Sequence, residues 1–400
     1  MKTVLLISIV SFSFAFGQNK KWSPPPVTDV EKAIIENPAQ AAKLIRSSFG
    51  SGTLVKGKHW VENTRILWMV ESEQPVSIYT KDGSLLTALK KLDDKGLQAA
   101  VMNPGNQVIV DFVAKAESGK EFNKATIKIE NYSYPPESFY KEGVPKGAIT
   151  RHSFNDSKIY PDTNRELEVY IPAQYKKGSA ASLLVFQDGL RHAEVASSGG
   201  LRAPVVMDNL IAAGDMPVTI GIFVNPGSLK TQKGGKPRNR SVEYDSLGDT
   251  YVNFLLDEII PFVKEKHGVS FVDDPAHRAI AGGSSGCACA WTAAWERPDK
   301  FGKVLGWVGT FVDIRGANAY PSLVRKTERK PIRAALLGEK QDIDNQFGNW
   351  PLANRQMETA LRFQNYDYRY WWGNGFHGSR HAAVMLPAMM RWLWSDVTAE

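Results

Sequence analysis

Two hydrophobic patterns follow one another along the 400-residue chain. Residues 30–47 carry apolar side chains at helical spacing, and from residue 53 the pattern changes to short apolar runs separated by Gly, Pro, Asn and Asp. These strand-like runs are 64–70, 76–79, 108–113 and 125–129. Short strands without intervening helices are typical of a β-sandwich. We therefore predict a small all-β, immunoglobulin-like accessory domain over residues 29–135.

The second pattern begins at residue 148, where strand-length apolar runs alternate with longer helical segments. Such alternation indicates an α/β domain, here over residues 148–398, with a mostly parallel sheet covered on both faces. Residues 136–147 are rich in Pro and Gly and are predicted to form a linker. The predicted strands are 166–171, 182–186, 218–224, 278–281, 304–308, 332–337 and 368–372, and the predicted helices are 251–266, 287–297, 352–363 and 382–394.

The first 17 residues have the pattern of a secretory signal peptide. Lys2 precedes an apolar run over residues 3–16, and Ala15 and Gly17 place small side chains where a signal peptidase cuts. The run is too short to span a bilayer, and no later stretch approaches the ~20 apolar residues of a transmembrane helix. We expect cleavage after Gly17 and a secreted or periplasmic mature chain without a membrane anchor.

Charge and cysteine content exclude several classes of function. The net charge is +7, and the one basic group, which contains Gly and Pro, favours a solvated loop or an anionic-substrate patch over a nucleic-acid surface. Two neighbouring cysteines, Cys287 and Cys289, suit neither a disulfide nor a zinc site, so we expect buried thiols and neither metal nor cofactor. The basic group comprises Lys230, Lys233, Lys236, Arg238 and Arg240.

The stretch AIAGGSSGCACAW, residues 279–291, joins a predicted strand to a predicted helix. A G-x-S-x-G sequence in this context forms a nucleophile elbow, in which a serine on a strained turn projects above the sheet. Ser284 fits better than Ser285, because only Ser284 has glycine two residues away on both sides. The backbone N–H of Ser285 would then point at the developing oxyanion. The alternative is that the glycines serve only tight packing.

A serine nucleophile needs a base and an acid, which follow it in the chain order Ser, acid, His. Only His377 and His381 come late enough, and His377 is favoured because it lies on a glycine-rich loop directly after a predicted strand. The acid should follow the strand at 332–337, where Asp342 is the first choice. Asp344 and Glu339 remain as alternatives. The acid would orient the imidazole and stabilise its charged form.

A second oxyanion donor is expected after the strand at 182–186. The sequence there continues Gln187-Asp188-Gly189-Leu190, and the glycine would let the Leu190 N–H approach a substrate carbonyl. Asp188 precedes the serine and is therefore a candidate for substrate binding rather than for the acid.

Several motifs occur in the order seen in the esterase family that includes enterochelin esterases and many bacterial carbohydrate esterases, which the region 147–397 resembles. The resemblance implies an α/β-hydrolase fold, a Ser–His–Asp triad and no metal, often with an N-terminal β-sandwich that can resemble a glycogen-binding module. Two departures are Phe376 where a second glycine usually precedes the histidine, and Cys287 in place of a glycine. The motifs are 186–189 (FQDG), 239–245 (NRSVEYD), 282–286 (GGSSG), 294–298 (AWERP), 348–354 (GNWPLAN) and 375–377 (GFH).

These observations together favour an exported serine esterase that removes acetyl or hydroxycinnamoyl groups from plant-type poly- or oligosaccharides. Its partner would be an ester-bearing carbohydrate or phenolic small molecule, and Trp350, Trp371 and Trp372 are candidates either for stacking on its rings or for core packing. One alternative is a siderophore trilactone esterase, with the basic residues facing an anionic substrate. Another is a carbohydrate-binding protein that keeps the fold without chemistry, against which the complete Ser, Asp and His set argues.

Overall fold

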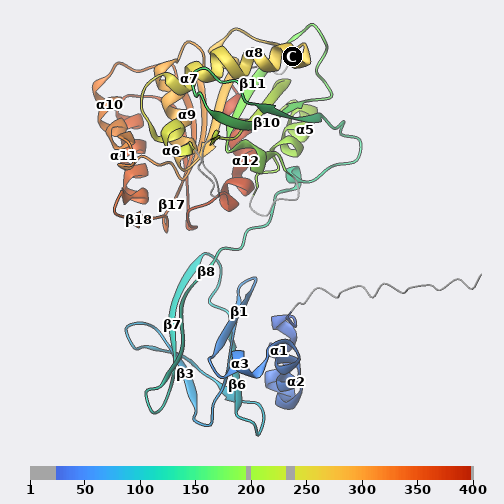
Figure 1. Cartoon of the computed structure of the whole chain (residues 1–400), viewed down its shortest axis with the longest axis vertical. Coiled ribbons are helices and arrows are strands. Elements are labelled where there is room, and N and C mark those ends of the chain that lie inside the picture. The colour runs from blue at the N-terminus through green and yellow to red at the C-terminus, as the bar shows by residue number, and fades with distance from the viewer. Residues whose placement is uncertain (1–23, 195–199, 231–238, 398–400) are drawn as a thin grey trace, which may run out of the picture. The chain divides into compact units, whose positions relative to one another are not determined.

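The computed structural model describes residues 24–194, 200–230 and 239–397. The chain forms two compact units, which divide between Ile129 and Glu130 (Figure 1). The predicted signal peptide lies outside the described residues. No helix within those residues has the length and apolar character needed to cross a membrane.

Within the described residues, the second unit is built on a ten-stranded sheet. The strands β9, β10 and β12 pair antiparallel, and the order β12-β11-β15-β16-β17-β20 is parallel throughout. This is the mostly parallel sheet that the sequence predicts. The strands are β9 (Ala148–Phe154), β10 (Thr163–Ile171), β11 (Ala180–Gln187), β12 (Thr219–Val224), β13 (Ser228–Leu229), β14 (Ser270–Phe271), β15 (Arg278–Gly283), β16 (Lys303–Trp307), β17 (Arg333–Glu339) and β20 (Asp367–Gly373).

Helices cover both faces of this sheet (Figure 1). Successive residues of β11 alternate between two hydrophobic cores, with Leu184 and Phe186 facing α4, α5 and α12, and Leu183 and Val185 facing α6 to α11. The helices are α4 (Gly189–Ala193), α5 (Ala203–Ala213), α6 (Arg240–Asp245), α7 (Thr250–Phe254), α8 (Ile260–His267), α9 (Ser285–Glu296), α10 (Tyr320–Lys326), α11 (Trp350–Phe363) and α12 (Arg380–Trp394). A π-helical turn, η2 (Leu255–Ile259), joins α7 to α8.

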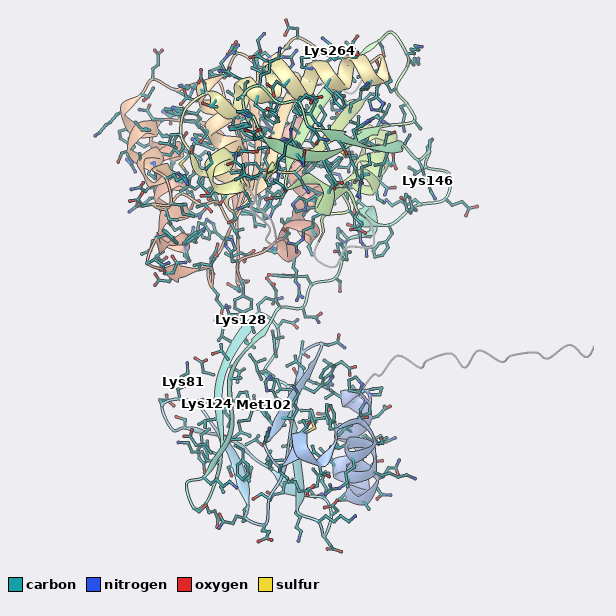
Figure 2. All side chains as sticks on the ribbon, viewed as in Figure 1. Lys81, Met102, Lys124, Lys128, Lys146 and Lys264 are labelled. Carbon is teal, nitrogen blue, oxygen red and sulfur yellow. The ribbon has the colours of Figure 1, made fainter. Side chains whose placement is uncertain are left out.

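The described part of the first unit holds two antiparallel sheets, ordered β1-β2-β6-β5 and β4-β3-β7-β8. Its strands are β1 (Lys58–Glu62), β2 (Arg65–Glu71), β3 (Val76–Tyr79), β4 (Leu85–Ala88), β5 (Lys90–Lys91), β6 (Leu97–Met102), β7 (Val108–Ala116) and β8 (Glu121–Ile129). On β2, Ile66 and Trp68 are buried in a core shared by both sheets, while Leu67 and Met69 pack against helices. The edge strand β8 exposes Lys124 (Figure 2), a charge that discourages pairing with another strand.

The helices of the first unit are α1 (Val27–Glu36), α2 (Pro38–Ser48) and α3 (Ser51–Leu54). The single helix predicted over residues 30–47 is therefore two helices. Asn37 separates them because a residue before proline is disfavoured in the helical conformation, and its φ is −150°. The Asn37 side chain caps the second helix by accepting the Gln40 N–H at 3.2 Å.

The segment predicted to be a linker packs on the second unit. On α5, the Asn209 amide donates to the carbonyl oxygens of Glu137 (2.8 Å) and Phe139 (3.0 Å). At the end of the segment, the Gly147 N–H donates to the Asp208 carboxylate at 2.9 Å. The structural boundary at residues 129–130 thus precedes the one predicted at 135–136, because polar backbone groups in this segment are satisfied by α5.

Candidate active site

Ser284 occupies a strained turn between β15 and α9. Its φ of 58° and ψ of −127° are unfavourable for a residue with a side chain, as expected of a nucleophile elbow. The turn is tight: a Cβ added at Gly282 would lie 2.3 Å from the carbonyl oxygen of Gly286. Ser285 begins α9, so its backbone N–H has no intrahelical acceptor and points outward at the positive end of the helix.

His377 lies on the loop between β20 and α12 and contacts both predicted partners. Its Nε2 is 2.8 Å from Ser284 Oγ, and its Nδ1 is 2.6 Å from Asp342 Oδ1. Asp342 follows β17, its side chain is 1% exposed, and the Ile343 N–H donates to the same Oδ1 at 2.7 Å. A buried carboxylate on Nδ1 holds the tautomer in which Nε2 is free to accept the serine proton.

The residues that the sequence left as alternatives lie elsewhere. The buried Ser285 side chain is hydrogen-bonded to Asp245. His381 contacts Glu339 Oε1 through Nδ1 at 2.5 Å. Asp344 is exposed on the short strand β18 (Asp344–Asn345). Of these groups, the structure brings only Ser284, His377 and Asp342 into one hydrogen-bonded row.

Thr310 is a neighbour of Ser284 that the sequence analysis missed. Its hydroxyl lies 3.1 Å from Ser284 Oγ, and its backbone N–H donates to the Ser284 carbonyl oxygen at 3.2 Å. Trp350 Nε1 donates to the same hydroxyl at 3.3 Å. Thr310 follows β16 without any recognisable pattern around it, so only the folded structure places it here.

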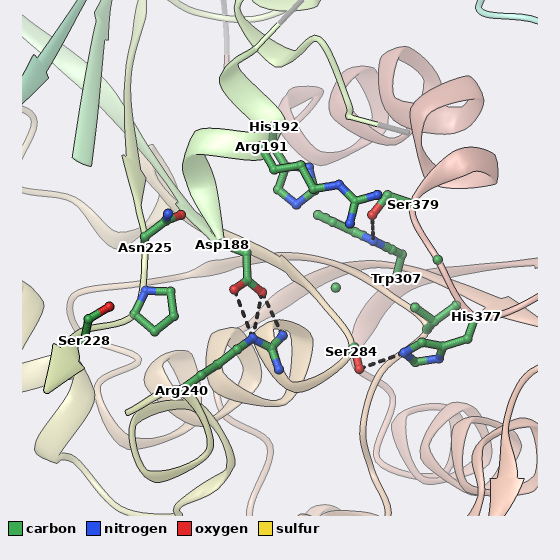
Figure 3. Close-up of a pocket in the computed structure, with 14 residues that line it drawn as sticks. Asp188, Arg191, His192, Asn225, Ser228, Arg240, Ser284, Trp307, His377 and Ser379 are labelled. Carbon is green, nitrogen blue, oxygen red and sulfur yellow. Dashed lines mark hydrogen bonds and ion pairs between the residues drawn. The ribbon is translucent and has the colours of Figure 1, made fainter. Parts of the chain in front are cut away.

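A cavity of about 620 Å³ opens in front of Ser284 and His377 (Figure 3). Burial lowers the pKa of His192, on its wall, to about 4, so the ring is neutral near pH 7. Its ring packs nearly perpendicular to that of Trp307, with centroids 5.2 Å apart, and Trp307 Nε1 donates to Ser379 Oγ at 3.1 Å. The other lining residues are Asp188, Arg191, Asn225, Pro226, Ser228, Arg240, Gly283, Val308 and Gly378.

Asp188 lines this cavity, but its carboxylate is engaged. It forms a two-pronged ion pair with Arg240, with Arg240 Nη2 2.7 Å from Asp188 Oδ2 (Figure 3). Its own N–H donates to the Tyr244 hydroxyl at 3.0 Å. Asp188 therefore shapes the pocket wall through Arg240 and does not offer a free carboxylate to a substrate. In the basic group predicted at 230–240, residues 231–238 lie outside the described part of the chain.

Two predictions about the surroundings need correction. The Leu190 N–H donates to Asn225 Oδ1 at 3.2 Å, because it lies in the first turn of α4 facing that amide, and so it is not a free oxyanion donor. Trp350 and Trp371 do not line the cavity. Trp350 is 3% exposed and its ring packs at 83° to the ring of His377, with centroids 5.9 Å apart, while Trp371 packs against Trp392 on α12.

The two cysteines are free and buried on α9. Burial raises the pKa of the Cys287 thiol to about 12, which makes it unreactive. Its sulfur occupies the space beside Gly306, where an added Cβ would lie 2.3 Å from Sγ. Across the described ranges, no group of three or more His, Cys, Asp or Glu side chains is arranged to hold a metal ion.

Together, the sheet order and the Ser284 elbow define an α/β-hydrolase. A profile of the family described as "Putative esterase" matches residues 159–360, just over half of the chain. The chain belongs to this esterase family and is a carboxylic ester hydrolase. A comparison with curated proteins found no match.

Solved structures of esterases share this fold at low sequence identity. Ferric enterobactin esterase from Salmonella typhimurium has a TM-score of 0.56 at 12% identity, over 85% of this chain and 97% of that chain. Enterobactin esterase from Shigella flexneri, in the presence of enterobactin, has a TM-score of 0.55 at 13% identity, over 86% of this chain and 97% of that chain. The CE1 ferulic acid esterase from Anaeromyces mucronatus, in complex with ferulic acid, has a TM-score of 0.50 at 17% identity, over 66% of this chain and 97% of that chain.

Proposed function

We propose that the chain hydrolyses its esters through an acyl-enzyme on Ser284. The observation that carries this proposal is the hydrogen-bonded row from Ser284 through His377 to Asp342 at a strained elbow. His377 Nε2 takes the hydroxyl proton as Ser284 Oγ adds to the ester carbonyl, and Asp342 stabilises the imidazolium. The Ser285 N–H stabilises the oxyanion.

The tetrahedral intermediate formed by this addition then collapses. The alcohol leaves with the proton held by His377, and the acyl group stays on Ser284. Water attacks this ester in turn, giving its proton to His377, and a second collapse releases the carboxylic acid and restores the serine hydroxyl. The two half-reactions together add one water across the ester bond.

For the substrate, we propose an acetyl or hydroxycinnamoyl ester of a plant-type poly- or oligosaccharide. The cavity of about 620 Å³ has room for a hydroxycinnamoyl group beside Ser284, and drug-sized ligands occupy pockets of ~300–1,000 Å³. Trp307 lines it, whereas the predicted Trp350 and Trp371 do not. The fold shared with a ferulic acid esterase is consistent with this class of ester.

Arg191 favours a second candidate, a negatively charged siderophore trilactone. Its side chain is exposed at the cavity and forms no ion pair with any described residue, whereas the charge of Arg240 is balanced by Asp188 (Figure 3). A free guanidinium suits catecholate or carboxylate oxygens. Replacing Arg191 by Gln should therefore raise KM for a ferric trilactone siderophore and leave KM for methyl ferulate unchanged.

The test is a substrate panel of p-nitrophenyl acetate, methyl ferulate, acetylated xylan and a ferric trilactone siderophore. Ser284→Ala should lose about 10⁶-fold in kcat on every substrate that is turned over. Ser285→Ala should keep most of the activity, because only its backbone N–H is used. Full activity in Ser284→Ala would refute the acyl-enzyme mechanism, and turnover of the siderophore alone would replace the proposed substrate with the second candidate.

We also propose that the mature chain is exported, on the evidence of the first 17 residues. Expression in a bacterium with two membranes should give a periplasmic protein whose N-terminal residue is Gln18. An intact Met1 on cytoplasmic protein would contradict export.

A further inference from the structure

The loop that carries His377 is held from behind by polar groups that take no direct part in the triad. The Gly375 N–H donates to Glu339 Oε2 at 2.7 Å, and the Phe376 N–H donates to Glu130 Oε1 at 3.2 Å. The backbone N–H groups of Gly375 and Phe376 are thus each bound to a carboxylate, and the His377 ring is bound to Asp342 and Ser284.

Glu339 joins this loop to a second imidazole. While Oε2 accepts the Gly375 N–H, Oε1 accepts from His381 Nδ1 at 2.5 Å, and the Glu339 side chain is 1% exposed. The His381 ring stacks on Tyr132, with ring centroids 4.9 Å apart and planes 7° apart. Glu339 therefore holds the edge of the His381 ring and Tyr132 covers one of its faces, so His381 has different partners from His377.

The loop lies directly on these groups. A Cβ added at Gly375 would lie 2.6 Å from the Tyr132 hydroxyl and 2.7 Å from Glu130 Oε1, so any larger residue would push the loop away. Burial raises the pKa of the Glu130 carboxyl, and the nearby Glu339 charge adds to this rise. Such closely packed polar groups keep their positions only as a set.

We infer that Glu130, Tyr132, Glu339 and His381 form a positioning cluster that holds His377 within hydrogen-bond distance of Ser284. Glu130 and Tyr132 come before residues 159–360, which match the esterase family, and directly after the last strand of the first unit. The second unit therefore depends for its active geometry on a segment outside its family core. This inference rests on the proposed catalytic role of His377.

The main test compares Glu339→Ala with Glu339→Gln on p-nitrophenyl acetate. Glu339→Ala removes both acceptors and should lower kcat by about 10²-fold with little change in KM, the size of effect expected from a small misplacement of a catalytic group. In Glu339→Gln the amide oxygen can still accept the Gly375 N–H and the amide N–H can donate to His381 Nδ1. This variant should recover most of the lost kcat.

Proton NMR gives a readout that a loss of stability alone would not move. The short hydrogen bond from His377 Nδ1 to Asp342 should give a downfield resonance that is absent from His377→Ala. We expect this resonance to shift or broaden in Glu339→Ala and to return in Glu339→Gln. Lys303→Met is the matched control: Lys303 is fully buried, contacts Asp396 away from the cavity, and its loss should lower stability without changing the resonance or kcat.

Glu130→Ala and Glu130→Gln repeat the test should Glu339→Ala fail to fold. Losing the Glu130 oxygen that accepts the Phe376 N–H should lower kcat about tenfold, and glutamine should restore it. Wild-type kcat and an unchanged resonance in the alanine variants, with Ser284→Ala inactive, would overturn the positioning cluster and leave the proposed function intact. Activity in Ser284→Ala would instead overturn the proposed function.

Discussion

At the scale of single residues, the site contains two acid–histidine pairs, and only one of them reaches the nucleophile. His377 bonds Asp342 on one nitrogen and Ser284 on the other, whereas His381 bonds Glu339 and stacks on Tyr132. Glu339 ends β17 and Asp342 follows it, and both histidines follow β20. The two pairs differ in which ring faces the elbow, and that difference sets their chemistry.

The acid's role leads to a prediction. Asp342→Asn should lower kcat by about 10⁴-fold, because an amide in place of the buried carboxylate favours the wrong tautomer of His377 and no longer balances its charge. Asp344→Asn, at an exposed position two residues later, should have no effect. Steady-state kinetics on p-nitrophenyl acetate check both, and comparable losses in the two variants would remove Asp342 from the triad.

His192 should make stability depend on pH. Its folded pKa of about 4 lies below the ordinary value of 6.5, so between these values the unfolded chain binds a proton that the folded chain does not. Stability is therefore lost as pH falls from 6.5 to 4, by up to about 3 kcal/mol. His192→Leu stays neutral and should lose less stability over this window. Urea unfolding at pH 7 and pH 4.5 measures the difference, and equal losses in both proteins would contradict it.

Ser284, His377 and Asp342 could be chosen from the sequence, because the nucleophile elbow has a local pattern, strand ends can be predicted, and the three groups follow the expected order along the chain. Side-chain direction was not available. Trp350 contacts the ring of His377 without lining the cavity, whereas Trp307 lines it, although both are tryptophans near strand ends. Thr310 and Glu130 reach the site through contacts distant in sequence, which leave no local pattern.

At the scale of elements, periodicity predicted most strands of the second unit and most of its long helices, but in the first unit it missed β1, β4, β5 and β6. It missed α5, in which every residue from Ala203 to Ile211 is buried. A helix without an exposed polar face has no alternation of apolar and polar residues at helical spacing. It also missed β9, whose first four residues, from Ala148 to Arg151, are exposed at the edge of the sheet. Proline chemistry, rather than periodicity, divides α1 from α2 at Asn37.

A buried ion pair links two of these elements. Arg165 on β10 and Glu243 on α6 are both fully buried, with Nη1 to Oε2 at 2.6 Å and Nη2 to Oε1 at 2.9 Å. The same carboxylate accepts the Gly227 N–H at 3.1 Å, and Arg165 Nη1 donates to the Asn225 carbonyl oxygen at 2.9 Å. The pair thereby holds the loop from Asn225 to Ser228 that borders the cavity.

Breaking this pair should destabilise the fold strongly. Arg165→Met leaves the Glu243 carboxylate buried without its cation and should cost about 3–5 kcal/mol of unfolding free energy. Adding Glu243→Leu removes the stranded charge, so the double variant should be more stable than Arg165→Met alone. Denaturant unfolding of the four proteins in the cycle measures the coupling, and strictly additive losses would show that the two side chains act independently.

At the scale of the whole molecule, the hydrophobic cores do not cross the boundary between Ile129 and Glu130. Among the described residues, two buried clusters consist only of first-unit side chains and two only of second-unit side chains. The first unit shares its sandwich core between both sheets, adds helices over β2 and β6, and has the size and the separate core of a domain that folds independently. Each unit should therefore unfold as its own cooperative transition.

A destabilising substitution in the core of one unit should then lower the unfolding temperature of that unit alone. Trp68, 1% exposed in the sandwich core, can be replaced by Ala at a cost of about 3–5 kcal/mol, which lowers the first unit's Tm by roughly 10 °C or more. Arg165→Met should shift the other transition and leave the first unchanged. Scanning calorimetry resolves the two, and residual esterase activity after heating assigns the second unit's transition. A single transition that both variants lower equally would show that the two units fold as one.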